Sequence, residues 1–75
     1  MDWEQVRARW SQLRGRVRMQ WGRLTDDQLD VIEGRRQLLL GQLQATYGVT
    51  EEEADRQVTL WEDSALNEDD HGVAR

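Results

Sequence analysis

The stretch LTDDQL, from Leu24 to Leu29, decides much of the fold, because a similar stretch, VTEEEA, recurs from Val49 to Ala54. In each, a Thr is followed by two acidic residues and then by a Gln or Glu whose side chain can reach back to the Thr backbone. This pattern is typical of a capping box, which starts a helix with two reciprocal hydrogen bonds. The acidic residues gain about 0.3–1 kcal/mol each from the helix dipole. The sequence therefore predicts two helix starts, capped by Thr25, Gln28, Thr50 and Glu53.

A glycine precedes each capped stretch, at Gly22 and Gly48, where the left-handed backbone just past a helix end favours glycine. Residues 13–22 and 39–48 also share Leu, Gly, an aliphatic residue, an aromatic residue and Gly at identical spacing. This match arises either from internal duplication or by chance. In both cases a unit of helix, aromatic residue, glycine and capped helix occurs twice. The sequence therefore predicts two helical hairpins packed on each other.

The segment before the first glycine carries an apolar stripe at steps of three and four residues, which predicts an amphipathic helix over about 3–21. The stripe consists of Trp3, Val6, Trp10, Leu13, Val17, Trp21 and Leu24. Arginines flank it on both sides and can cover its margins with their aliphatic stems. Gly15 and Gly41 fall outside the stripes, and two interpretations stay open. They either permit a close approach of another helix or are simply tolerated.

The middle of the chain could form one helix, but Arg36 would then lie at the centre of its apolar stripe. Burying a lone guanidinium costs several kcal/mol, whereas Gly34 can turn the chain cheaply. We therefore predict helices over about 25–33 and 35–47, separated at Gly34, with Arg36 turned to water, and a last helix over about 51–63. The expected core consists of Trp10, Leu13, Val17, Trp21, Leu29, Ile32, Leu39, Leu43, Tyr47, Val58 and Trp61.

Composition fits a small helical protein of 75 residues, with four Trp, no Pro and no Cys. Such a core is only just large enough to offset chain entropy, and the Trp side chains can each bury roughly 150–250 Å². The absence of Cys is compatible with a reducing cytosol, and no stretch resembles a signal peptide or a membrane span. We predict one cytoplasmic, all-α domain over 1–63 and a disordered acidic tail over 64–75.

Charge is distributed unevenly along the chain, which has a net charge of −5. All ten basic residues are Arg, and six of them precede Thr25, whereas nine of the acidic residues lie in 49–75. The arginines of the first helix form the candidate interaction surface, which consists of Arg7, Arg9, Arg14, Arg16, Arg18 and Arg23.

The motif content resembles one protein family. WSQLRGRVRMQWGRLTDDQL (10–29) followed by IEGRRQLLLGQLQATYG (32–48) is similar to the CsbD family of bacterial stress-response proteins, with Arg where relatives usually carry Lys. The likeness covers roughly Trp10 to Trp61. It implies a four-helix bundle of two α-hairpins packed crosswise, as in SAM domains, together with bacterial origin and induction in the general stress response. It implies no catalytic or ligand residues.

Several function classes can be weighed against these residues. Catalysis needs a base poised near neutral pH, but the single His, His71, lies in the predicted tail. The NEDDH run (67–71) could offer oxygen ligands to a divalent ion, although a solvated charge run explains it equally. We therefore predict no enzyme activity, no metal and no cofactor. The amphipathic first helix could bind a membrane surface, but the core needs it inside.

Two binding roles remain. The first is protein–protein interaction or a protective role in stress, with an unknown partner or salt-sensitive self-association of a monomer. The alternative is weak nucleic-acid binding through the Arg-rich first helix. Net acidity opposes the alternative, and the same arginines could instead be solvated and paired with acidic residues of the last helix.

Overall fold

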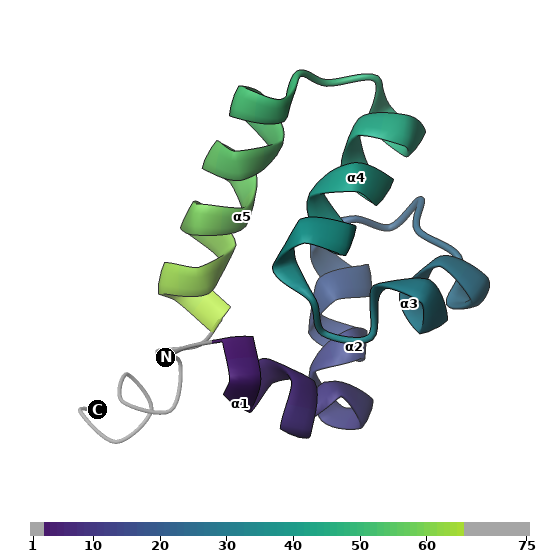
Figure 1. The fold of residues 1–75 in the computed structure, drawn as a ribbon, viewed down its shortest axis with the longest axis vertical. Coiled ribbons are helices and arrows are strands. Elements are labelled where there is room, and N and C mark those ends of the chain that lie inside the picture. The colour runs from purple at the N-terminus through teal and green to yellow at the C-terminus, as the bar shows by residue number, and fades with distance from the viewer. Residues whose placement is uncertain (1–2, 66–75) are drawn as a thin grey trace.

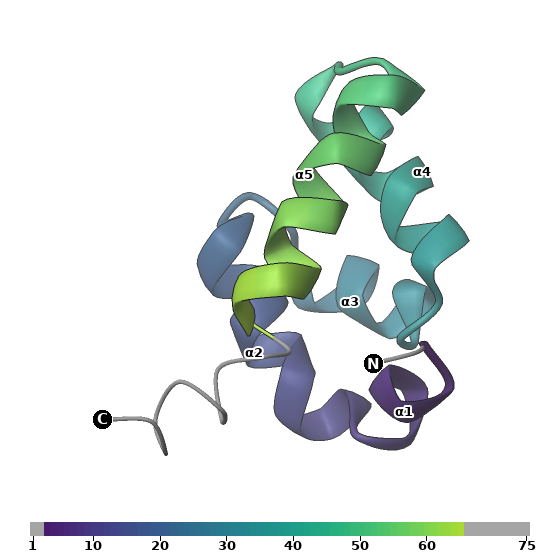
Figure 2. The ribbon, with the colours of Figure 1, turned by 90° about the vertical axis from the view of Figure 1, so that its left-hand side faces the viewer.

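The computed structural model describes residues 3–65, and every secondary-structure element within that range is an α-helix. The helices are α1 (Trp3–Ala8), α2 (Trp10–Gln20), α3 (Asp26–Ile32), α4 (Arg36–Tyr47) and α5 (Glu51–Ala65). α4 and α5 run antiparallel side by side, and α1, α2 and α3 gather around the end of α4 where it begins (Figure 1; Figure 2). Of the disordered tail expected over 64–75, residues 64 and 65 instead belong to α5, which is longer than the predicted helix over 51–63, and the rest lies outside the described residues.

The prediction of a single first helix over 3–21 is wrong, and with it the count of four helices. The chain breaks at Arg9, whose N–H bonds to the carbonyls of Gln5 at 3.1 Å and Val6 at 3.2 Å. The break turns α1 across α2 (Figure 2). The Trp3 ring then lies 6.0 Å from the Trp61 ring on α5. No Gly or Pro lies at the break, so no local signal predicts it. The break instead accompanies contacts between α1 and residues far away in the chain. The crosswise SAM-like packing stays a prediction.

The α3–α4 corner lies at Gly34, as the sequence predicts, and α3 ends one residue earlier than expected. Glu33 and Gly34 both take left-handed backbone, with φ of 52° and 76°. Gly34 is also buried, because it packs directly against the backbone of α1. Gly48 ends α4 with φ of 69°, as expected. Gly22 does not adopt this conformation, because Trp21 closes the end of α2 instead.

The two predicted caps differ in detail. At α3 both bonds of the capping box form between Thr25 and Gln28. At α5 the Thr50 hydroxyl accepts the Glu53 N–H at 3.1 Å, but the Glu53 carboxylate bonds Gln57 and Arg56. Gln57 in turn accepts the Trp21 indole N–H at 3.0 Å. The Glu53 side chain therefore supports the contact between α5 and Trp21.

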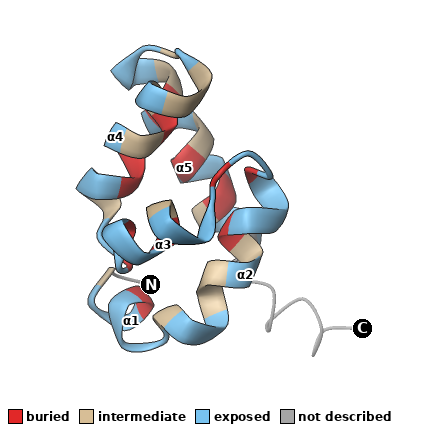
Figure 3. Cartoon of the chain, turned by 90° about the vertical axis from the view of Figure 1, so that its right-hand side faces the viewer, coloured by how far each residue is buried: buried red, intermediate tan, exposed pale blue. Residues whose placement is uncertain are grey.

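The core lies where α2, α3, α4 and α5 meet (Figure 3 shows buried residues in red). Of the expected core residues, three are only half-buried at its edge: Trp10, Leu13 and Tyr47. The others are buried: Val17, Trp21, Leu29, Ile32, Leu39, Leu43, Val58 and Trp61. Val6, Leu24, Leu40 and Ala54 are buried as well. Gly15 and Gly41 face open space, so neither permits a close helix approach.

Candidate functional site

The arginines expected to form one interaction surface differ in whether the fold already occupies their side chains. Arg14 bonds Asp30 at 2.9 Å and Arg18 bonds Asp26 at 2.7 Å, and both carboxylates belong to α3. The suggested pairing with the last helix is therefore wrong for this pair, because α3 packs beside α2. Exposed ion pairs stabilise a fold by about 0–1 kcal/mol each, so their main effect is to neutralise this side of α2.

Arg23 and Arg16 are also occupied. The Arg23 guanidinium lies 5.4 Å from the centroid of the Tyr47 ring, and its backbone N–H donates to the Tyr47 hydroxyl at 3.1 Å. This pair joins the end of α4 to the connection that precedes α3. Arg16 is half-buried on α2 and is not without a partner.

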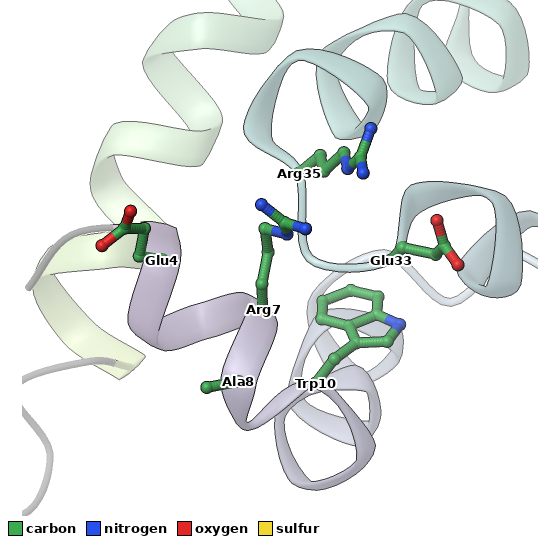
Figure 4. A pocket seen from close by; sticks show the side chains of 6 residues that line it. All are labelled: Glu4, Arg7, Ala8, Trp10, Glu33 and Arg35. Carbon is green, nitrogen blue, oxygen red and sulfur yellow. The ribbon is translucent and has the colours of Figure 1, made fainter.

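Arg7 differs from these residues, because it lines a hollow of about 540 Å³ with Arg35 and Trp10. Figure 4 shows the Arg7 side chain rising from α1 and the Arg35 side chain leaving the start of α4, with their guanidinium groups on the same side of the hollow. Within residues 3–65 neither guanidinium makes an ion pair or a hydrogen bond. The full lining is Glu4, Arg7, Ala8, Trp10, Glu33 and Arg35.

The indole of Trp10 is held in place at the base of this hollow. Its Nε1–H donates to the carbonyl oxygen of Leu29 at 3.1 Å, so the ring orientation is fixed by α3. The ring is half-buried, and it lies next to the Arg7 side chain in Figure 4. The hollow thus combines two guanidinium groups and the carboxylates of Glu4 and Glu33 with a positioned apolar surface.

Sequence reasoning missed Arg35, Glu33 and the role of Trp10 in this hollow. Arg9, by contrast, is exposed at the break between α1 and α2 and does not line it. The Gly34 corner is the signal that could have indicated the hollow. A glycine there allows the corner to pack closely on another helix, and Arg35, the next residue, is then brought to that helix. The partner helix could not have been identified from spacing alone.

Arg36 faces α5, whereas the sequence predicts that it turns to water. Its guanidinium bonds Asp55 at 2.7 Å, Glu62 at 3.0 Å and Thr59 at 3.2 Å. Glu62 also accepts the Trp3 indole N–H at 2.5 Å, so one carboxylate joins α1, α4 and α5. Burial lowers the pKa of Arg36, but its hydrogen bonds and the charges of Asp55 and Glu62 outweigh burial and raise it. Arg36 is thus a charged structural residue.

The structure can be searched for a metal site and for a membrane-spanning helix. Among residues 3–65, no group of three or more His, Cys, Asp or Glu side chains is arranged to hold a metal ion. The predicted candidates in 67–71, His71 included, lie outside the described residues. Over the same range, no helix is long and apolar enough to cross a bilayer.

Comparison with known proteins gives a consistent result. The family model described as CsbD-like matches residues 4–56. The chain is 46% identical over 63 residues to the "UPF0337 protein ECA0631" of Pectobacterium atrosepticum, which covers 84% of this chain and 91% of that protein. It is 40% identical over 62 residues to the "UPF0337 protein YjbJ" of Escherichia coli K12, covering 83% and 90% of the two chains.

A third relative is longer. The chain is 47% identical over 61 residues to the "UPF0337 protein NE2439" of Nitrosomonas europaea, which covers 81% of this chain but 65% of that protein. No solved structure matches the chain significantly.

Proposed function

The chain belongs to the CsbD-like family, and on that premise we propose that it is a small non-enzymatic bacterial protein of the general stress response. It acts in the cytoplasm by contacting other proteins, either to recruit them or to protect them. The family membership supports the biological setting, and the arrangement of charged side chains supports the mode of action.

One observation carries the proposal of protein contact, namely that the arginines are not all neutralised by the fold. Arg14 and Arg18 are paired within the molecule, whereas Arg7 and Arg35 share an exposed hollow without an ion pair in the described chain. Arg9 lies close by in sequence and is exposed. Glu4 and Glu33 line the same hollow but bond neither guanidinium within the described chain, so Arg7 and Arg35 can still donate charge-assisted hydrogen bonds to an acidic group of a partner.

The chemistry of the hollow favours binding over catalysis. A guanidinium stays protonated at every physiological pH, so Arg7 and Arg35 can hold an anion but cannot exchange protons with a substrate. The guanidinium of Arg36 bonds two carboxylates of α5 and is therefore not available to a ligand. These side chains therefore suit recognition.

The alternative, weak nucleic-acid binding through the first helical segment, has less support. Two of the six arginines proposed for it are paired with α3, and an Arg that already bonds a carboxylate neutralises a phosphate less effectively. Trp21 and Trp61 are 3% and 4% exposed, so they cannot stack on bases without opening the core.

The experiment is a cross-linking capture from stressed cells, with the full chain and with two charge-reversed variants. One variant carries R7E and R35E, and the other carries R14E and R18E. We expect proteins captured by the wild type at low salt to be lost with R7E/R35E and retained with R14E/R18E. Capture that requires nucleic acid, shown by its loss after nuclease treatment, would favour the alternative. Capture of no protein by the wild type would count against protein contact.

A further inference from the structure

We infer that the hollow lined by Arg7, Trp10 and Arg35 binds the carboxylate group of a single Asp or Glu side chain on a partner protein. This inference rests on the proposed function and specifies which residues make the contact. It follows from how the corner between α3 and α4 packs on α1, from the charges brought together there and from the surface beneath them.

The corner between α3 and α4 brings the two arginines to one hollow. A Cβ atom built on Gly34 would lie 2.7 Å from the Cα of Arg7, closer than real Cβ contacts come, and 3.1 Å from its N. Only a glycine lets the two backbones meet, and its φ of 76° is also a conformation that other residues rarely adopt. Because Arg35 follows Gly34 directly, its side chain is brought to the same hollow as that of Arg7.

The charges placed there are incompletely compensated within the described chain. Two like charges at one site repel each other, and within residues 3–65 no carboxylate bonds Arg7 or Arg35, although Glu4 and Glu33 also line the hollow. Elsewhere the fold does supply one, since Arg14, Arg18, Arg36 and Arg56 each bond an acidic side chain. An incoming carboxylate would accept charge-assisted hydrogen bonds from both guanidinium groups, and Arg binds this group in a two-bond geometry.

Trp10 gives the hollow a surface for the carbon atoms next to that carboxylate. Its ring cannot rotate freely, because its N–H is bonded to Leu29. The methylene groups of a Glu or Asp side chain could lie against the ring while the carboxylate meets the arginines. The volume of about 540 Å³ is within the range of roughly 300–1,000 Å³ that is usual for ligand sites, and the hollow is open enough for a peptide to reach it (Figure 4).

The rim of the hollow favours a single acidic side chain over a nucleic-acid backbone. Glu4 and Glu33 line it too, and Figure 4 shows their carboxylates on opposite sides of the two guanidinium groups. A chain of phosphates that passed through the hollow would bring further negative charge close to these carboxylates. A single acidic side chain, flanked by neutral or basic residues, would avoid that repulsion.

The test uses the full chain labelled with ¹⁵N and an end-blocked probe peptide with sequence Ala-Arg-Glu-Ala, titrated at low salt and followed by NMR. We expect saturable shifts of the Trp10 indole N–H and of the Arg7 and Arg35 side-chain N–H signals. The same peptide with Gln in place of Glu should cause none. In the variant R7Q/R35Q binding should weaken at least about tenfold, as expected when charge-assisted bonds are lost.

The matched control is R18Q/R56Q, which removes two positive charges from exposed ion pairs outside the hollow. It should bind the peptide as the wild type does at the same ionic strength. If R7Q/R35Q fails to fold, R7K/R35K keeps both charges but loses the two-bond geometry, and it should bind several-fold more weakly.

Three outcomes would overturn the inference: peptide binding that persists in R7Q/R35Q, equal weakening in R18Q/R56Q, or a short single-stranded oligonucleotide that occupies the hollow more tightly than the peptide. Shifts of the same signals that grow with protein concentration alone would support it, with a second copy of the chain as the partner. Failure of the peptide to bind, together with salt-sensitive capture of proteins through other residues, would refute this site and leave the proposed function standing.

Discussion

Gly34 packs on Arg7 so closely that a methyl group at position 34 would lie 2.7 Å from the Arg7 Cα. This contact places the α3–α4 corner on α1, and it brings Arg35 to the hollow that Arg7 and Trp10 line. One glycine therefore has two roles. It ends α3 with a left-handed backbone, and it sets the geometry of the proposed binding site.

Replacing Gly34 with Ala should destabilise the protein by about 2–4 kcal/mol, because it adds strain at positive φ to a clash with backbone. Urea unfolding followed by Trp fluorescence measures this loss. Gly15→Ala is the matched control, since Gly15 lies within α2 and a Cβ atom there would face open space. That change should stabilise the protein by about 0.5–1 kcal/mol. Equal effects at the two positions would contradict the close packing of Gly34.

Replacing Glu62 with Gln should cost about 1–3 kcal/mol, because it leaves the half-buried Arg36 with one carboxylate fewer and weakens the bond to Trp3. Thermal unfolding of the variant measures the loss. Glu52→Gln, the same change at an exposed position in the first turn of α5, loses only its favourable interaction with the helix dipole and should have a smaller effect. If the two variants lost the same stability, the bonds around Arg36 would not stabilise the fold more than an exposed charge does.

Replacing Thr25 with Ala should cost about 1 kcal/mol, and replacing Thr50 with Ala should cost less. Thr25 takes part in both bonds of its box, whereas Thr50 accepts one bond and the Glu53 side chain points elsewhere. Ser at either position keeps the hydroxyl and should restore most of the stability. A larger loss at Thr50 than at Thr25 would show that the two caps are ranked wrongly.

Replacing both Asp26 and Asp30 with Asn should release Arg14 and Arg18 and raise the affinity of the protein for DNA. Each free arginine that meets a phosphate steepens the salt dependence of binding by about one unit of slope. Fluorescence anisotropy of a labelled oligonucleotide at several salt concentrations measures both quantities. Unchanged affinity would indicate that α3 does not mask this side of α2.

Stability should decrease in acid partly through Glu53, and only below its ordinary pKa. Hydrogen bonds from Gln57 and Arg56 lower the pKa of the Glu53 carboxyl in the folded state. Its stabilising contribution is therefore present above the ordinary value near 4.5 and is lost as pH falls through the lower folded value. Urea midpoints across this range should change less with pH in Glu53→Gln than in the wild type. A steeper pH dependence in the variant would contradict the direction of the shift.

Local signals in the sequence predict most of the helices correctly. The Thr25 box, the Gly48 end and the corner at Gly34 each depend on bonds between residues that are close in the chain. The apolar spacing likewise predicts the inward faces of α3, α4 and α5, because helical periodicity alone selects them. Family membership also follows from short runs of residues, and it needs no tertiary structure.

The sequence by itself thus determined that this chain is helical, where its later helices begin, where α4 ends, and which family it belongs to. Only the tertiary structure decided the break at Arg9, the capture of Arg36 by α5 and the meeting of Arg7 with Arg35. Those features depend on contacts between residues far apart in the chain, such as Trp3 with Glu62. The free energy of burial and pairing at such contacts exceeds the weak preference of any local segment to continue as a helix, and no local pattern records it.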